Sequence, residues 1–182
     1  MDSQTGDGPP RAVLIAALVV AVGGLVGVLA VAALNQRTPG QEPVAVTAAP
    51  APQADSPQCR ALLDGLPEQL GDFRRAPLVD PAPPGAAAWQ RVDGGEALIL
   101  RCGLDRPAEF TVGAPLQVVD AVQWFRVEDP AGGDRSTWFA VDRAVYVALT
   151  LPPESGPTPI QGLSATLADT LPARPPDPAP LG

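Results

Sequence analysis

An uninterrupted apolar run near the N-terminus constrains the fold of this chain more than any other feature. Residues 12–34 are 23 consecutive uncharged side chains, almost all of them apolar. As a helix they would extend over roughly 34 Å, which is enough to cross the hydrocarbon core of a bilayer. A helix is stable in lipid because it satisfies its own backbone hydrogen bonds. The run therefore predicts a single transmembrane helix, with the rest of the fold after it.

A cleaved signal peptide is the alternative interpretation of this run, because residues 30–32 (Ala-Val-Ala) resemble a cleavage site. Secretory apolar cores are usually only about 7–15 residues long, so the length favours an uncleaved anchor. Arg11 and Arg37 flank the run and leave the positive-inside comparison close to a tie. A short N-terminal tail before a single anchor usually stays in the cytosol. We therefore expect a single-pass cell-membrane protein with a cytoplasmic tail at 1–11 and an extracytoplasmic C-terminal domain.

Proline-rich segments flank one domain-sized stretch. Residues 35–57 are rich in proline and alanine and predict a linker, and residues 171–182 predict a disordered tail. Residues 58–170 between them suffice for one small domain. The net charge of −8 and the scattered arginines argue against a nucleic-acid partner, which needs clustered cations.

The domain opens with "SPQCRALLDGLPEQL", which predicts a helix. Ser56 fits the N-cap, and Pro57 fits the first helical position, where its missing N–H is no loss. Gly65 and Pro67 are expected to break the helix into two short pieces. Its apolar side chains follow helical spacing and form one stripe: Cys59, Leu62, Leu63, Leu66 and Leu70.

The segment "AAAWQRVDGGEALILRCG" predicts a β-hairpin. A two-residue turn at Asp93-Gly94 would place Arg91 opposite Glu96 and Trp89 opposite Leu98, whereas a turn at 94–95 would pair Trp89 with Leu100. Both registers place Trp89 on one face with Leu98, Leu100 and Cys102, because side chains alternate with a period of two. Arg101 must then point to the opposite face, with Ile99.

The remaining pattern predicts strands at 115–119, 121–127, 136–141 and 144–151, followed by a helix at 159–170. In the last strand Val145, Val147, Leu149 and Leu151 share one face, and Tyr146, Ala148 and Thr150 share the other. The helix carries Ile160, Leu163 and Leu167 on one side. These elements predict an α+β domain whose antiparallel sheet is covered on one side, with two or three flanking helices.

Both cysteines of the chain are predicted to face the core, Cys59 from the helix and Cys102 from the strand. In an exported domain two inward cysteines most simply form a disulfide, which would stabilise the fold by roughly 4 kcal/mol. The alternative is a reactive thiol at Cys102 beside Arg101. That chemistry needs an exposed, electropositive setting, and the chain has no C-x-x-C spacing.

Several of these features together resemble an actinobacterial envelope family catalogued as domain of unknown function thirty-five-fifteen. They are the N-terminal anchor, the Pro/Ala spacer, Cys59 followed by "LLDGLPEQL", a tryptophan before "LILRCG", and the later "VQW". The likeness extends from Cys59 to about Leu167, and "LRCG" is its most specific motif. The resemblance implies a membrane-anchored or exported location and pairing of Cys59 with Cys102. It implies no particular reaction.

Residues with catalytic chemistry are sparse. The chain has no histidine, which excludes a Ser-His-Asp triad and a histidine-ligated metal. Glu128, Asp129 and Asp134 could form a carboxylate cluster for glycoside chemistry or calcium, but a solvated turn is favoured because calcium-loop spacing is missing. Trp124 and Trp138 could stack on sugars, although aromatics in strands usually belong to the core. We predict no catalytic residue, metal or cofactor.

The candidate binding surface comprises Arg101, Tyr146, Arg74 and Arg75, and the adjacent pair at 74–75 could contact an anionic envelope polymer. The sequence therefore favours a membrane-anchored, non-enzymatic module that binds or scaffolds an envelope protein or polymer. The alternative is an extracytoplasmic thiol-redox or hydrolytic enzyme that uses Cys102 or the loop of Glu128, Asp129 and Asp134.

Overall fold

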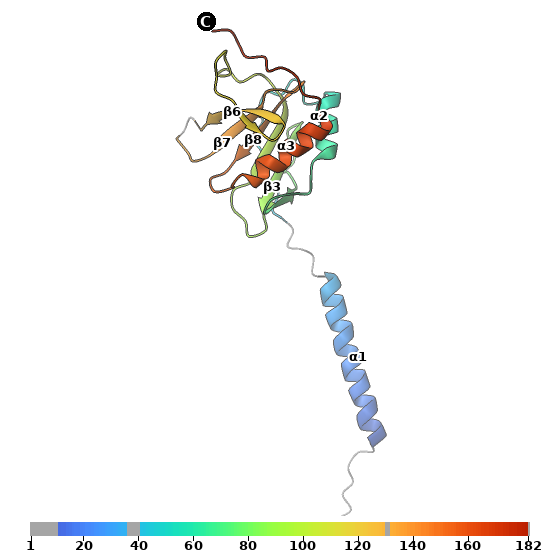
Figure 1. Ribbon diagram of the computed structural model, residues 1–182. Coiled ribbons are helices and arrows are strands. Elements are labelled where there is room, and N and C mark those ends of the chain that lie inside the picture. Colours follow the sequence, from blue (N-terminus) through green and yellow to red (C-terminus); the bar gives the residue numbers. More distant parts are fainter. Residues whose placement is uncertain (1–10, 36–40, 130–131, 182) are drawn as a thin grey trace, which may run out of the picture. The chain divides into compact units, whose positions relative to one another are not determined.

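The N-terminal apolar run forms helix α1 (Arg11–Asn35) in the computed structural model (Figure 1). The structure describes residues 11–35, 41–129 and 132–181, with side chains of α1 from 12 to 27. Nothing among the described residues amounts to a helix long and apolar enough to cross a membrane. The predicted transmembrane helix at 12–34 is thus not confirmed, and residues 28–34 of it lie outside the described side chains. Residues 1–10 of the predicted cytoplasmic tail also lie outside the described residues.

A second compact unit begins at Gln41 and contains an antiparallel sheet. In the described part of this unit the sheet has eight strands, and the fourth strand in sequence pairs with the eighth. The first four strands in sequence therefore form one half of the sheet, and the last four form the other half. The spatial order is β1 (Gln69–Leu70), β2 (Phe73–Ala76), β3 (Ala86–Arg91), β4 (Leu98–Leu104), β8 (Tyr146–Leu151), β7 (Ser136–Ala140), β6 (Val122–Glu128) and β5 (Gln117–Val119).

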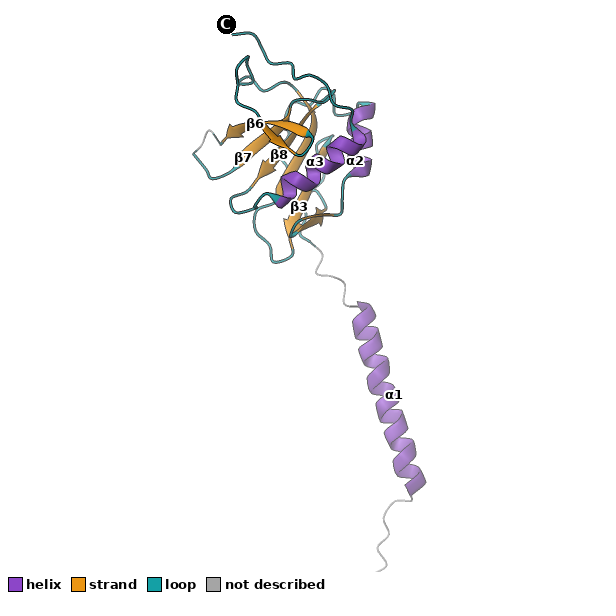
Figure 2. Cartoon of the chain, viewed as in Figure 1, coloured by secondary structure: helices purple, strands orange, loops and turns teal. Residues whose placement is uncertain are grey.

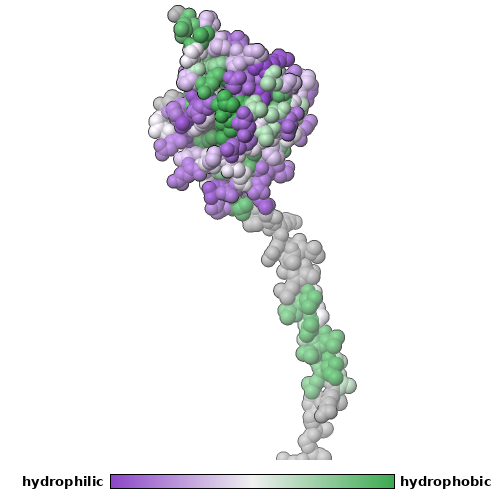
Figure 3. Space-filling model, viewed as in Figure 1, coloured by the Kyte–Doolittle hydropathy of each residue, from purple (hydrophilic) through white to green (hydrophobic). Residues whose placement is uncertain are grey.

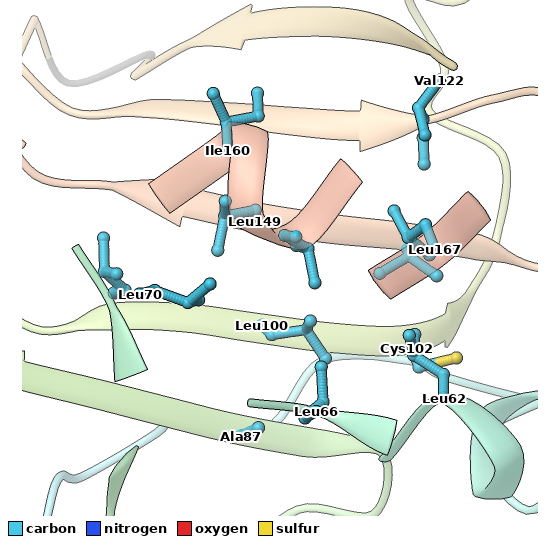
Figure 4. Packing of buried hydrophobic residues seen from close by; sticks show 14 of the residues in the cluster. Leu62, Leu66, Leu70, Ala87, Leu100, Cys102, Val122, Leu149, Ile160 and Leu167 are labelled. Carbon is cyan, nitrogen blue, oxygen red and sulfur yellow. The ribbon is translucent and has the colours of Figure 1, made fainter. Parts of the chain in front are cut away.

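Two helices cover one face of this sheet, which we call the helix face (Figure 2). Helix α2 (Pro57–Gly65) begins as predicted, because the Ser56 hydroxyl accepts a hydrogen bond from the Cys59 N–H at 3.2 Å. Helix α3 (Thr158–Thr170) packs on α2 and on the sheet. Leucines of both helices point at the strands in Figure 4, where Leu62 and Leu167 lie close to Cys102. The predicted α+β class with an antiparallel sheet is confirmed.

Two buried tryptophans join the sheet to the segments that cover it. Trp89 of β3 is fully buried and donates from Nε1 to the Pro67 carbonyl at 2.9 Å. Trp124 of β6 donates from Nε1 to the Ser164 hydroxyl at 3.0 Å, on the buried side of α3. Each indole therefore satisfies its only polar group inside the core, which removes the cost of burying it.

A disulfide links α2 to β4. Cys59 and Cys102 are bonded, their Cα atoms lie 5.6 Å apart, and both side chains are fully buried. The predicted crosslink is confirmed. It joins the first helix of the unit to a central strand across 43 residues of sequence, so the unfolded chain loses much of its freedom.

Two local predictions were wrong. No second helical piece follows Gly65; residues 69–70 form β1 instead, because the chain turns at Pro67 to hydrogen-bond with Trp89. The hairpin register is the one that pairs Trp89 with Leu98, but a loop at 92–97 replaces the two-residue turn. Glu96 does not lie opposite Arg91 in the ladder; its carboxylate pairs with Arg135 at 2.8 Å.

Both segments outside 58–170 hydrogen-bond to the unit where the structure describes them. In the N-terminal arm, defined as residues 41–54, the Val44 N–H bonds the Pro77 carbonyl and the Gln53 N–H bonds the Gly103 carbonyl. In the C-terminal tail, defined as residues 171–181, the Ala179 N–H bonds the Phe110 carbonyl. The compact unit therefore begins at Gln41 instead of at residue 58. The proline-rich composition did not predict this boundary, because the segment is held by backbone hydrogen bonds and carries few apolar side chains.

Candidate functional site

We call the face of the sheet opposite the helices the open face. Segments without regular secondary structure lie against it, whereas helices cover the helix face. The N-terminal arm reaches this face at Arg101, whose Nη2 donates to the Thr47 carbonyl at 3.1 Å. The parity predicted for the strand is thereby confirmed, since Leu100 and Cys102 are fully buried in the core whereas Arg101 lies on the other side.

The motif "LRCG" acquires a structural explanation here, because each of its four residues has a separate task. Leu100 packs in the core, Arg101 reaches the open face, and Cys102 forms the disulfide. Gly103 sits at a bulge in the β4–β8 ladder with φ of +85°, and a Cβ atom there would collide with the backbone of Gln53 and Ala54. Only glycine combines this conformation with so close an approach of the arm.

A cavity of about 330 Å³ opens on this face beside Arg101. The sheet supplies its floor, the arm supplies one wall, and the chain just after β4 supplies another. Two of the floor residues are joined, because the hydroxyls of Thr137 and Thr150 lie 3.1 Å apart. The lining residues are Ala49, Pro50, Arg101, Leu104, Asp105, Pro107, Thr137, Phe139, Ala148 and Thr150.

Arg101 is the polar group that distinguishes this cavity. Its Nε is buried and has no hydrogen-bond partner among the described residues. The ion pairs found within the described part of the chain do not include Arg101. Burial lowers the pKa of its guanidinium, yet arginine remains charged. A half-buried cation without a carboxylate partner is costly, so an incoming acceptor would relieve an existing penalty.

The other three predicted binding residues do not join Arg101 in the cavity. Arg75 lies on the helix side of the sheet, with its guanidinium 4.8 Å from the centre of the Trp89 ring. Arg74 is exposed on β2. Tyr146 belongs to a second apolar cluster with Phe110, and its hydroxyl donates to the Asp177 carbonyl at 3.3 Å. The four residues therefore do not form one surface.

The three predicted acidic residues at the end of β6 and in the loop after it do not share one partner. Glu128 pairs with Arg126 at 3.1 Å, and Asp134 is exposed. Over the described residues, which omit 130–131 of this loop, there is no group of three side chains that could hold a metal ion. Asp129 contributes to the electrostatic environment of Arg135. These contacts resemble those of a charged surface turn more than those of a paired-carboxylate site.

The remaining candidates of the sequence occupy the helix face. Trp124 is buried in the core. Trp138 is half-buried, and the Arg126 guanidinium lies 5.4 Å from its ring centre. It borders a second cavity of about 370 Å³ near the start of α3. Cys102 is bonded to Cys59, so it presents no thiol for redox or nucleophilic chemistry.

Sequence reasoning missed most of the cavity. Period-two patterning did place Ala148 and Thr150 on one face of β8. Thr137 and Phe139 alternate in the same way with the core-facing residues of β7, so the same pattern could have assigned them too. Residue spacing could not predict that β4, β8 and β7 are neighbours in the sheet. Nothing in the local sequence predicted that Pro50 lines a cavity, since the proline-rich composition predicted a linker there.

The fold and the cavity together define a small disulfide-linked α+β domain with an arginine-containing pocket on one sheet face. The chain belongs to the family described as "Protein of unknown function (DUF3515)", whose model matches residues 18–176. No curated protein and no solved structure matches it. The family resemblance seen in the sequence is therefore confirmed, while its function has to be argued from the site.

Proposed function

We propose that this protein is a membrane-anchored, extracytoplasmic binding module without enzymatic activity, and that it binds a component of the cell envelope at the cavity beside Arg101. The observation that carries the proposal is the buried Nε of Arg101, which has no partner in the described part of the chain and lies next to a largely apolar cavity. Binding sites commonly combine apolar walls, which provide affinity, with a few polar groups, which fix orientation.

The sequence of α1 supports anchoring. In its described part nine large apolar side chains are each more than half exposed: Val13, Leu14, Ile15, Leu18, Val19, Val20, Val22, Leu25 and Val26. Figure 3 shows apolar residues along the described stretch of this helix. Exposed apolar surface of this extent is unfavourable in water and favourable in a lipid phase. We therefore propose the whole run at 12–34 as the anchor.

The disulfide supports an extracytoplasmic position for the domain. Structural disulfides persist in oxidising compartments and are rare in the cytosol. The same bond argues against the alternative of a thiol-redox enzyme, because both sulfurs belong to fully buried residues, out of reach of a substrate.

Location is tested with protease added to intact spheroplasts. Cleavage of the domain, while a cytosolic marker stays intact, is the expected result. Protection of the domain in spheroplasts, followed by cleavage after the membrane is permeabilised, would contradict an extracytoplasmic position.

Binding is tested by photo-crosslinking in intact cells. A photoreactive amino acid replaces Ala49 at the exposed cavity wall, and a matched control replaces Asp64, which is exposed on α2. We expect a discrete adduct from position 49 that is absent from position 64. Equal labelling from both positions, or no adduct from position 49, would contradict a binding site at the cavity.

A further inference from the structure

We propose that the cavity beside Arg101 binds a small amphipathic carboxylate, with the carboxylate on the Arg101 guanidinium and the apolar body on the cavity walls. This inference rests on the proposed binding function and specifies its ligand. It follows from three properties of the cavity, which are the unused donor, the apolar lining and the balance of charge.

The unused donor determines the head of the ligand. Arg101 already gives one hydrogen bond, from Nη2 to the Thr47 carbonyl, while Nε is buried and has no partner within residues 41–129 and 132–181. A carboxylate matches the planar guanidinium by accepting two parallel hydrogen bonds, one from Nε and one from an Nη group. Charge-assisted hydrogen bonds of this kind are stronger than those to a neutral acceptor, so an anionic head is favoured over an alcohol or amide.

The apolar lining determines the body of the ligand. Phe139, Ala148 and Leu104 of the floor and Pro50 and Pro107 of the walls offer carbon surface to a bound molecule. The volume of about 330 Å³ is near the lower limit of small-molecule sites, which span roughly 300–1,000 Å³. A short acyl chain or a small ring fits this space, whereas a whole membrane lipid exceeds it.

The balance of charge limits the ligand to one negative charge. Arg101 is the one cation among the lining residues, and Asp105 lines the same cavity with an acidic side chain. A phosphate monoester carries close to two negative charges at neutral pH, so it would leave charge uncompensated beside Asp105. The net charge of −8 also repels multivalent anions. A monocarboxylate is therefore favoured over a phosphate.

The position of the arm provides a second readout. Arg101 bonds the arm at Thr47, and Ala49 and Pro50 form a cavity wall. A molecule lying between the arm and the sheet would contact both and hold them together. Ligand binding should therefore slow amide hydrogen exchange at Gln53, whose N–H bonds Gly103, more than at Cys59 in α2.

The test uses the full-length chain in a nonionic detergent, labelled with ¹⁵N-arginine, and titrated with octanoate. Octanol, octylamine and octyl phosphate serve as probes with the same chain and a different head. We expect octanoate to shift the Arg101 Nε–Hε resonance in a saturable manner and to slow exchange at Gln53. The alcohol and the amine should leave that resonance unchanged, and octyl phosphate should bind more weakly than octanoate.

Substitutions of Arg101 distinguish the contribution of its positive charge to octanoate binding from that of its planar guanidinium geometry. Arg101→Gln should weaken octanoate binding by at least about tenfold, as expected for losing hydrogen bonds to a charged group. Arg101→Lys should recover only part of this loss, because lysine lacks the planar fork. Arg74→Gln removes an exposed arginine of β2 and is the matched control, with affinity unchanged. Exchange protection at Cys59 in each variant shows whether the domain remains folded.

Three results would overturn the inference: equal binding of octanol and octanoate, tighter binding of octyl phosphate, or full octanoate affinity in a folded Arg101→Gln variant. If octanoate fails to bind while position 49 still gives an adduct in cells, the ligand class is wrong and the binding function stands. If position 49 gives no adduct while octanoate binds through Arg101, the cavity has the proposed chemistry, and its assignment to an envelope component is wrong.

Discussion

The two faces of the sheet are built in different ways. The helix face is closed by α2 and α3, with leucines and two tryptophans packed densely and a disulfide across the contact. The open face is covered by segments without regular structure, and a half-buried arginine lines its cavity. The helix face also has a cavity, beside Trp138, but among the described residues no buried donor without a partner lines it. Dense packing provides stability, while a polar group without a partner beside a cavity favours a ligand. The comparison therefore separates residues that hold the fold from residues that are available for function.

The substitution expected to test this contrast most strongly removes one of the two fully buried tryptophans of the helix face. Trp89→Ala should lower the free energy of unfolding by about 3–5 kcal/mol, because it leaves a cavity and an unpaired Pro67 carbonyl. Denaturant unfolding with the disulfide intact measures the loss. A loss below about 1 kcal/mol would mean that the helix face does not dominate stability.

Removal of the crosslink is expected to have the next largest effect. The Cys59→Ala, Cys102→Ala double variant should lose roughly 4 kcal/mol, little more than either single variant, because the two cysteines form one bond. Reductant should lower the melting temperature of the native protein and leave the double variant unchanged. Equal responses of the two proteins to reductant would contradict a stabilising disulfide.

Gly103→Ala probes the boundary between the two faces. The φ of +85° and the nearby backbone of the arm should together cost about 2 kcal/mol, within the range for strained non-glycine residues. Amide exchange should rise at Gln53, which bonds Gly103, before it rises in α3. Gly113→Ala is the matched control, since it has a similar φ of +86° and open space around it. Equal losses of stability in the two variants would mean that the positive φ alone accounts for the cost, and would exclude a contribution from contact with the arm.

The open face should tolerate change far better. Arg101→Gln should alter the free energy of unfolding by less than about 1 kcal/mol, because it removes one bond to Thr47 and also removes a buried unpaired donor. Thermal unfolding beside Trp89→Ala gives the direct comparison. A loss as large as that of Trp89→Ala would show that the guanidinium is part of the fold.

The smallest expected effect is a pH dependence on the open face. Burial raises the pKa of the Tyr146 phenol, so folding favours its neutral form. The contribution is complete below the unfolded-state pKa of about 10 and is lost as pH rises through the higher folded-state value. Tyr146 is the single tyrosine of the chain, so phenolate absorbance reports it alone. Tyr146→Phe should reduce the alkaline loss of stability, and an unchanged loss would exclude this residue as its source.

Sequence patterning predicted the helix face well and the open face poorly. The spacing of Cys59 and Leu62, and the alternation around Cys102, are local consequences of burying one side of a helix or strand. The cavity depends on which strands become neighbours and on where the arm lies, and both are settled by contacts between residues far apart in sequence. Arg101 could be assigned to a face from its parity, but its missing partner could not be predicted.

The disulfide also determines which part of the compact unit would unfold first if the chain were pulled from its N-terminal side. Tension that enters from the N-terminal side acts first on the arm, which is held by separate backbone hydrogen bonds, two at Val44 and one at Gln53. Those bonds can open one after another until the tension reaches Cys59, where a covalent bond passes it directly to β4. The segment that can peel away thus ends at Cys59. Pulling on the N-terminus would remove the cavity wall that the arm forms and leave the helix face assembled.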